Sequence, residues 1–140
     1  MKILIYIKGW LTCNEKNLIT INDLYEINKK LVTMFGGVGV GFKDENLAIS
    51  AIEGCNQEVF GLELYPELED KIAHLVFSIT KNHIFLDGNK RTSAFVLNML
   101  CKKNNIKLNI ELDRVILDLS TDIIKEKDLA KLIKSFRNLD

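Results

Sequence analysis

The stretch His-Ile-Phe-Leu-Asp-Gly-Asn-Lys-Arg, residues 83–91, decides our interpretation of the fold, because it interrupts two segments of helical periodicity. The apolar repeat of 66–81 breaks where the stretch begins, and Asp87-Gly88 is a typical turn pair, so a loop is predicted here. Helical spacing resumes over 89–104. This second helix is apolar nearly all round, which predicts that it is the central, buried helix of the domain.

The end of the predicted loop has the features of an anion-binding site. The start of a helix presents unpaired backbone N–H groups and the positive end of the helix dipole. Here Gly88 permits a tight turn, Asn89 adds an amide, and Lys90 and Arg91 add positive charge. Arg91 in particular suits a bidentate grip on phosphate. The sequence therefore predicts a phosphate site at these four residues.

Two side chains of the same loop suit chemistry on a bound phosphate. The near-neutral pKa of histidine makes His83 the natural general base for a hydroxyl nucleophile. Asp87 is the type of residue that holds Mg²⁺ beside phosphate oxygens. Ile84 and Phe85 are expected to anchor the loop on the core. Each residue alone also has an ordinary structural explanation, so the prediction of phosphoryl-type transfer depends on the ordered set.

This ordered set resembles the Fic/Doc family, whose motif is H-x-F-x-[D/E]-[G/A]-N-[G/K]-R, and every defining position matches. The resemblance extends over residues 18–138 and includes Phe-Gly-Gly at 35–37 and Leu-Tyr-Pro-Glu-Leu at 64–68. It implies a compact, mainly α domain with a central buried helix after the motif loop and short β pieces at its edges. Residues 1–17 are left as an N-terminal strand or arm of unknown role.

The resemblance also implies roles for the loop. The catalytic residues would be His83 as general base, Asp87 as the Mg²⁺ ligand, and Lys90 and Arg91. The nucleotide would be ATP, bound by Gly88, Asn89, Lys90 and Arg91.

Two positions separate the branches of this family. Fic proteins, which transfer AMP from ATP to a protein hydroxyl, have Gly after the Asn and a second Arg three residues beyond the first. This chain has Lys90 and Ala94 there, as the Doc (death-on-curing) branch does. The resemblance therefore favours a Doc-like toxin that phosphorylates a Ser or Thr of a target protein, with translation elongation factor Tu as the expected target. AMP transfer is the alternative.

The resemblance implies protein partners as well. Many Fic proteins inhibit themselves through an [S/T]-x-x-x-E-[G/N] helix, but the nearest match, Ser50 to Gly54, is one residue too short. An inhibitor is therefore expected on a separate antitoxin chain, with a helix lying over the active site. A flap that docks the target by strand pairing is expected at 55–65.

Two other classes of function stay open. A metal nuclease could use His83, Asp87 and Asn89 as ligands, but it needs more ligands, and the other histidine is His74. A degenerate family member could bind a partner without catalysis. A Walker-type phosphate loop at the glycines of 36–41 is rejected, because the run follows a helix and lacks G-K-[ST]; a connector is expected instead.

Composition limits the remaining possibilities. The 140 residues suit one domain, and 47% apolar residues can form its core. The formal net charge of zero argues against direct nucleic-acid binding. Three widely spaced cysteines fit a reducing compartment. With no signal-peptide cleavage site and no apolar stretch approaching the ~18–20 residues of a membrane span, a cytoplasmic protein is expected.

Periodicity predicts the remaining elements. Thr20 and Asp23 form a capping-box-like start for a helix whose inner face includes Met34. Pro66 is placed in the first turn of the third helix. The predicted helices are 21–34, 44–54, 66–81, 89–104, 113–124 and 127–138, and the predicted strands are 3–7 and 106–111.

Overall fold

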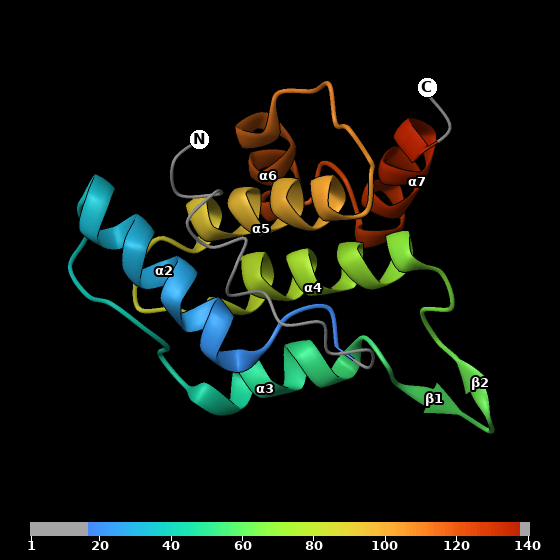
Figure 1. Ribbon diagram of the computed structural model, residues 1–140, viewed down its shortest axis with the longest axis horizontal. Helices are drawn as coiled ribbons and strands as arrows, with labels where there is room; N and C mark the ends of the chain where they lie inside the picture. The colour runs from blue at the N-terminus through green and yellow to red at the C-terminus, as the bar shows by residue number, and fades with distance from the viewer. Residues whose placement is uncertain (1–16, 138–140) are drawn as a thin grey trace.

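The computed structural model describes residues 17–137 as a bundle of helices with one small β-hairpin (Figure 1). The predicted strand at 3–7, and most of the arm at 1–17, lie outside these residues. The mainly α prediction is confirmed. The elements are α2 (Ile21–Phe35), α3 (Glu45–Gly54), β1 (Glu58–Val59), β2 (Leu62–Glu63), α4 (Leu68–Asn82), α5 (Asn89–Lys103), α6 (Leu112–Ser120) and α7 (Glu126–Arg137).

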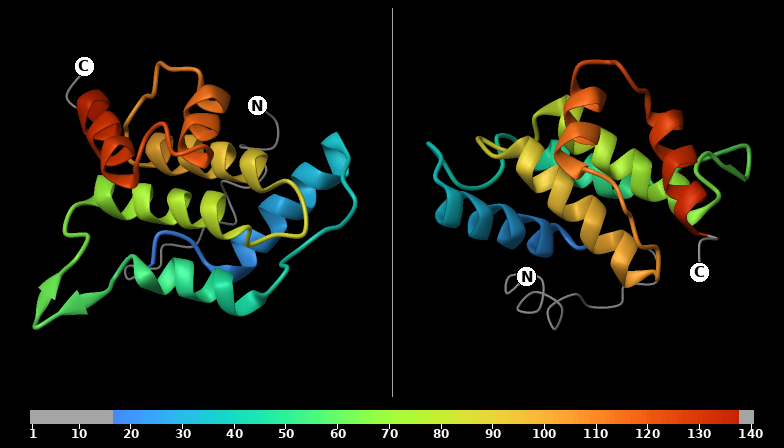
Figure 2. Two further views of the ribbon diagram at one scale, coloured as in Figure 1. Left: turned by 180° about the vertical axis from the view of Figure 1, so that it is seen from behind. Right: turned by 90° about the horizontal axis from the view of Figure 1, so that it is seen from above.

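Helices α4 and α5 form the centre of the molecule. Helix α4 packs against α3, α5, α6 and α7, and α5 also contacts α2 and α6 (Figures 1 and 2). Every residue from Thr92 to Leu97 is buried, so the prediction of a central helix after the loop is confirmed. Burial of this apolar surface supplies the main driving force for folding.

The boundaries of the helices follow their caps. The Thr20 hydroxyl accepts a hydrogen bond from the Asp23 N–H at 3.0 Å, so the predicted start of α2 is confirmed. Helix α4 begins later than predicted, because Glu67 is its N-cap and forms a capping box with Asp70. Pro66 therefore precedes the helix and is not part of its first turn.

Three further expectations were wrong. Residues 106–111 form a connection and not a strand, because no described segment pairs with them. Helix α6 ends at Ser120, and not near 124, since the chain turns at Asp122 with a φ of 65°. Met34 is 60% exposed, because the last turn of α2 extends past the core.

The β-hairpin falls inside the segment expected to be a flap, but not beside the motif loop. Val59 pairs with Leu62 across a two-residue turn in which Phe60 and Gly61 both have positive φ. The hairpin precedes α4 and the loop follows it, so they lie at opposite ends of a 15-residue helix, roughly 22 Å apart along its axis (Figure 1). The assignment of 55–65 as the flap over the site is therefore wrong.

Within the described part of the chain, no helix has the length and apolar character needed to cross a membrane.

Candidate functional site

The motif loop, residues 83–88, begins and ends with a left-handed residue. His83 follows α4 with φ 47° and ψ 59°, and Gly88 is the N-cap of α5 with φ 72°. A side chain at Gly88 would be strained by this φ and would meet Val32 Cγ2 at 3.3 Å. A histidine in this conformation costs roughly 1–2 kcal/mol, which the surrounding structure must offset.

The first half of the motif loop is fixed in the core. Ile84 and Phe85 are buried, which confirms their role as anchors. The Phe85 ring stacks on Phe42 with 5.2 Å between centroids. The Lys43 N–H donates to the Ile84 carbonyl at 2.8 Å, so the segment after α2 pairs with the motif loop.

Asn89 holds the loop closed from the first turn of α5. Its side-chain oxygen accepts from the Phe85 N–H at 2.9 Å, and its amide nitrogen donates to the Phe85 carbonyl at 3.0 Å. The side chain predicted to contact phosphate therefore braces the loop. The first backbone N–H groups of α5 have no intrahelical partners, and they supply the anion-binding potential.

Asn28 of α2 is a site residue that sequence reasoning missed. It is fully buried, and its amide nitrogen donates to the Asp87 carbonyl at 2.9 Å and to the Thr92 hydroxyl at 3.2 Å. Its side-chain oxygen accepts from the Gly41 N–H at 2.9 Å. The available signal was an amide on the apolar face of a helix, one turn after Leu24.

The glycine loop, residues 36–41, is more than the connector that was expected. The Val38 N–H donates to Asp87 Oδ2 at 2.8 Å, and the Gly41 carbonyl accepts from the Leu86 N–H at 3.0 Å. The loop thus lies directly against the motif loop.

Asp87 is held as a carboxylate. Besides Val38, the Gly88 N–H donates to its Oδ1 at 2.7 Å. These two hydrogen bonds, the Val38 bond first, hold the pKa of Asp87 below its ordinary value, and the charge of Arg91 acts in the same direction. Asp87 is consequently ionised at neutral pH.

This carboxylate fits Mg²⁺ bound together with phosphate. Residues 17–137 contain no group of three or more His, Cys, Asp or Glu side chains arranged to hold a metal ion. Mg²⁺ commonly takes one or two carboxylates plus phosphate oxygens and waters, so one ionised Asp87 is a sufficient protein ligand. Each oxygen of Asp87 accepts a single N–H and keeps further acceptor capacity.

The cationic side chains of the site are exposed. Lys90 and Arg91 lie in the first turn of α5, and the Arg91 guanidinium sits 4.7 Å from the centre of the Phe35 ring. Arg91 also borders a groove of about 430 Å³ between α2, α5 and the start of α6. The groove is mainly apolar with a polar edge and is lined by Leu31, Phe35, Arg91, Ala94, Phe95, Asn98, Ile110, Glu111, Leu112 and Asp113.

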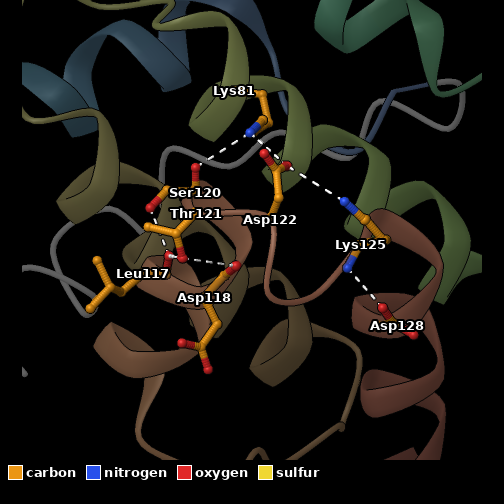
Figure 3. Close-up of polar contacts among 8 residues, drawn as sticks. All are labelled: Lys81, Leu117, Asp118, Ser120, Thr121, Asp122, Lys125 and Asp128. Atoms are coloured by element: carbon orange, nitrogen blue, oxygen red, sulfur yellow. Dashed lines mark hydrogen bonds and ion pairs between the residues drawn. The ribbon is translucent and has the colours of Figure 1, made fainter.

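The His83 side chain is exposed, and no described residue hydrogen-bonds to it. Its position therefore depends on the backbone at the end of α4. That end is clamped to the turn after α6, because Lys81 Nζ donates to the Ser120 carbonyl at 3.3 Å and to Asp122 Oδ1 at 2.8 Å (Figure 3).

The other histidine does not join the site. His74 Nδ1 lies 3.0 Å from Glu126 Oε1, and its ring stacks on Tyr65 with 4.1 Å between centroids. His74 precedes His83 by nine residues on α4, and it serves contacts between α4, α7 and the segment before α4. The structure thus offers a nuclease no second histidine ligand near the motif loop.

Comparisons with known proteins single out the same region. The family model described as the Fic/DOC family matches residues 18–101. The protein described as Toxin Doc of Mycolicibacterium smegmatis (strain ATCC 700084 / mc(2)155) is 33% identical over 92 residues, which cover 66% of this chain and 68% of that protein. The residues of the family match include α2, the glycine loop, α4, the motif loop and most of α5.

Proposed function

We propose that this chain, which belongs to the Fic/Doc family, is a Doc-like toxin that transfers the γ-phosphate of ATP to a serine or threonine hydroxyl of a target protein. The observation that carries the proposal is the motif loop, in which an exposed histidine, an ionised Asp87 and the start of α5 adjoin one another. The target proposed is translation elongation factor Tu, and the setting is the cytoplasm.

The reaction follows from the placement of these groups. His83 takes the proton of the target hydroxyl as its oxygen attacks the γ-phosphorus. The bond from that phosphorus to the β-phosphate oxygen breaks, ADP leaves, and the protein carries the phosphate. Gly88, the backbone N–H groups of α5 and the cations Lys90 and Arg91 hold the phosphates. Asp87 would hold Mg²⁺ together with a bound nucleotide, and the cation would neutralise phosphate charge there.

Two residues of α5 support phosphoryl transfer over AMP transfer. Lys90 stands at the exposed start of the helix, where its side chain adds charge and bulk next to the phosphate site. Ala94, one turn later, is buried in the wall of the groove and has no group that could bind a phosphate. AMP transfer remains the second candidate, because the rest of the motif is common to both branches.

A separate antitoxin chain is part of the proposal. The groove beside Arg91 has apolar walls from two helices, which suits the apolar face of a third helix. A helix seated there would cover Arg91 and block the phosphate site. We expect co-expression of the antitoxin to relieve toxicity; continued toxicity with the cognate neighbour would contradict this part of the proposal.

The test uses purified protein, elongation factor Tu, Mg²⁺ and ATP labelled at either the α- or the γ-phosphate, with mass spectrometry of the target. A gain of one phosphate from γ-labelled ATP, absent with His83→Ala, supports the proposal. A gain of AMP from α-labelled ATP supports the alternative. If neither appears, stabilisation by ATP and Mg²⁺ separates a nucleotide-binding enzyme with another target from a member that only binds a partner.

A further inference from the structure

Asp87 lies against two successive residues of the glycine loop, Gly37 and Val38. The Val38 N–H donates to its Oδ2 at 2.8 Å. A Cβ atom added at Gly37 would lie 2.8 Å from the same oxygen and 3.0 Å from Val32 Cγ1. The first distance is shorter than real Cβ contacts, so any side chain at position 37 must displace the carboxylate or the loop.

The glycine loop is braced at both ends. The Gly36 N–H donates to the Val32 carbonyl at 2.8 Å at the end of α2. At the other end, Gly41 bonds to Asn28 through its N–H and to Leu86 through its carbonyl. The side chain of Val38 is 95% exposed, so this residue contributes its backbone N–H and almost no packing.

We propose that Gly37 and Val38 are positioning residues that aim the Asp87 carboxylate at the divalent cation of a bound nucleotide. The inference rests on the proposed function, in which Asp87 holds Mg²⁺. The two oxygens of Asp87 accept from different N–H groups, Oδ1 from Gly88 and Oδ2 from Val38. Together these bonds fix rotation of the carboxylate and thus the direction of its remaining lone pairs.

The structure separates this role from that of a simple connector. A connector would need flexible residues, but its backbone would not need to approach another side chain closely at any one position. Here the close approach occurs at Gly37 and involves the proposed metal ligand itself. Hydrogen-bond partners that orient a metal ligand typically contribute 10–100-fold to metal affinity.

The glycine loop also provides a matched control. A Cβ atom at Gly39 would lie 3.2 Å from Leu86 Cδ1, the end of a flexible side chain that is 54% exposed. Gly37→Ala and Gly39→Ala therefore add the same methyl group to one loop, and only the first places it against Asp87 itself.

The experiment measures the Kd of a non-hydrolysable ATP analogue with and without Mg²⁺ by calorimetry, in the wild type, Asp87→Asn, Gly37→Ala and Gly39→Ala. We expect Mg²⁺ to tighten binding to the wild type and to Gly39→Ala. The effect should vanish in Asp87→Asn and fall roughly 10–100-fold in Gly37→Ala. Thermal unfolding of each variant checks that it is folded.

The two possible failures are distinguishable. A wild type indifferent to Mg²⁺, or an Asp87→Asn variant that keeps the full effect, removes the proposed metal role and this inference with it. Loss of the effect in Asp87→Asn but not in Gly37→Ala leaves the metal role intact and overturns the positioning role.

A second measurement applies if Gly37→Ala does not fold. In the wild type, the amide resonance of Val38 should shift when Mg²⁺ is added to the analogue complex, because the cation polarises the carboxylate that accepts its hydrogen bond. The amide of Gly39 is the reference. A Val38 resonance that moves no more than that of Gly39 would overturn the inference.

Discussion

Asn28 joins α2, the glycine loop and the motif loop with a single amide group. Its three hydrogen bonds satisfy the Gly41 N–H, the Asp87 carbonyl and the Thr92 hydroxyl in a position where water has little access. We predict that Asn28→Leu, which keeps a similar volume but removes these bonds, lowers the free energy of unfolding by about 1–3 kcal/mol. It should also reduce target modification, because both loops lose their common support.

Urea unfolding and the modification assay test this prediction. Asn98→Leu is the control, because Asn98 is half-buried at the groove and its side chain makes no hydrogen bond to a described residue. Equal effects of the two substitutions would show that the Asn28 bonds have no special role.

At His83, a single substitution should change stability and activity in opposite directions. Its φ of 47° is unfavourable for a side chain and easy for glycine, which is the usual residue just after a helix. We predict that His83→Gly raises the free energy of unfolding by up to about 1 kcal/mol. The substitution relieves backbone strain in the folded protein, and the greater conformational entropy of glycine in the unfolded chain offsets part of this gain. The same variant should lose target modification. Denaturation of His83→Gly and His83→Ala side by side is the measurement, and the alanine variant, which keeps the strained conformation, should gain nothing.

At the scale of elements, the sequence was most informative where one local pattern determined the outcome. The periodicity of 89–104 predicted α5, and the turn pair Asp87-Gly88 predicted the loop before it. The alternation of 106–111 was misleading, because a strand also needs a partner to pair with. The hairpin formed at 58–63 instead, where its turn uses Phe60 at positive φ and so lacks the usual Asn-Gly signal.

The same reasoning explains what was missed at the site. The order His83, Asp87, Asn89, Arg91 could be read directly, because the residues are neighbours in the chain. Asn28 and Val38 contact Asp87 across 59 and 49 residues, and no local pattern specifies such contacts. Asn89 was predicted to contact phosphate. Its bonds to Phe85 could not be predicted, because they depend on the folded shape of the loop.

Helix α7 is attached to α4 by an ion pair with a buried member. Glu69 is fully buried in the first turn of α4, and its Oε1 lies 2.9 Å from Arg137 Nη1 in the last turn of α7. Neither oxygen of Glu69 has a hydrogen bond to a described residue, so Arg137 is its main compensation. We predict that Arg137→Met lowers the free energy of unfolding by about 1–3 kcal/mol, because a buried charge is left unpaired.

Urea unfolding of the single and double variants tests this pair. Adding Glu69→Gln to Arg137→Met should recover part of the loss, since the buried charge is removed. A double variant no more stable than Arg137→Met would mean that the unpaired charge of Glu69 is not the source of the loss.

At the scale of the whole molecule, the site forms where three chain segments meet on the surface of one core. Helix α2 supplies Asn28, the glycine loop supplies Val38, and the motif loop supplies the reacting groups. Helices α4 and α5, which the motif loop connects, are also the most central helices. The geometry of the site should therefore persist until the whole core opens. Opening of the core can be measured through the reactivity of its buried cysteine thiols.

Cys55, at the end of α3, and Cys101, in α5, are buried in this core. Burial raises the pKa of each thiol to about 12, so the reactive thiolate is scarce at neutral pH. In a Cys13→Ser variant, we predict that a thiol reagent labels Cys55 and Cys101 at one slow rate, which rises with urea along the slope of global unfolding. Mass spectrometry of the labelled protein over time gives both rates. Faster labelling of Cys55 would show that α3 opens by itself, and in that case the core would not be the single cooperative unit that supports the motif loop.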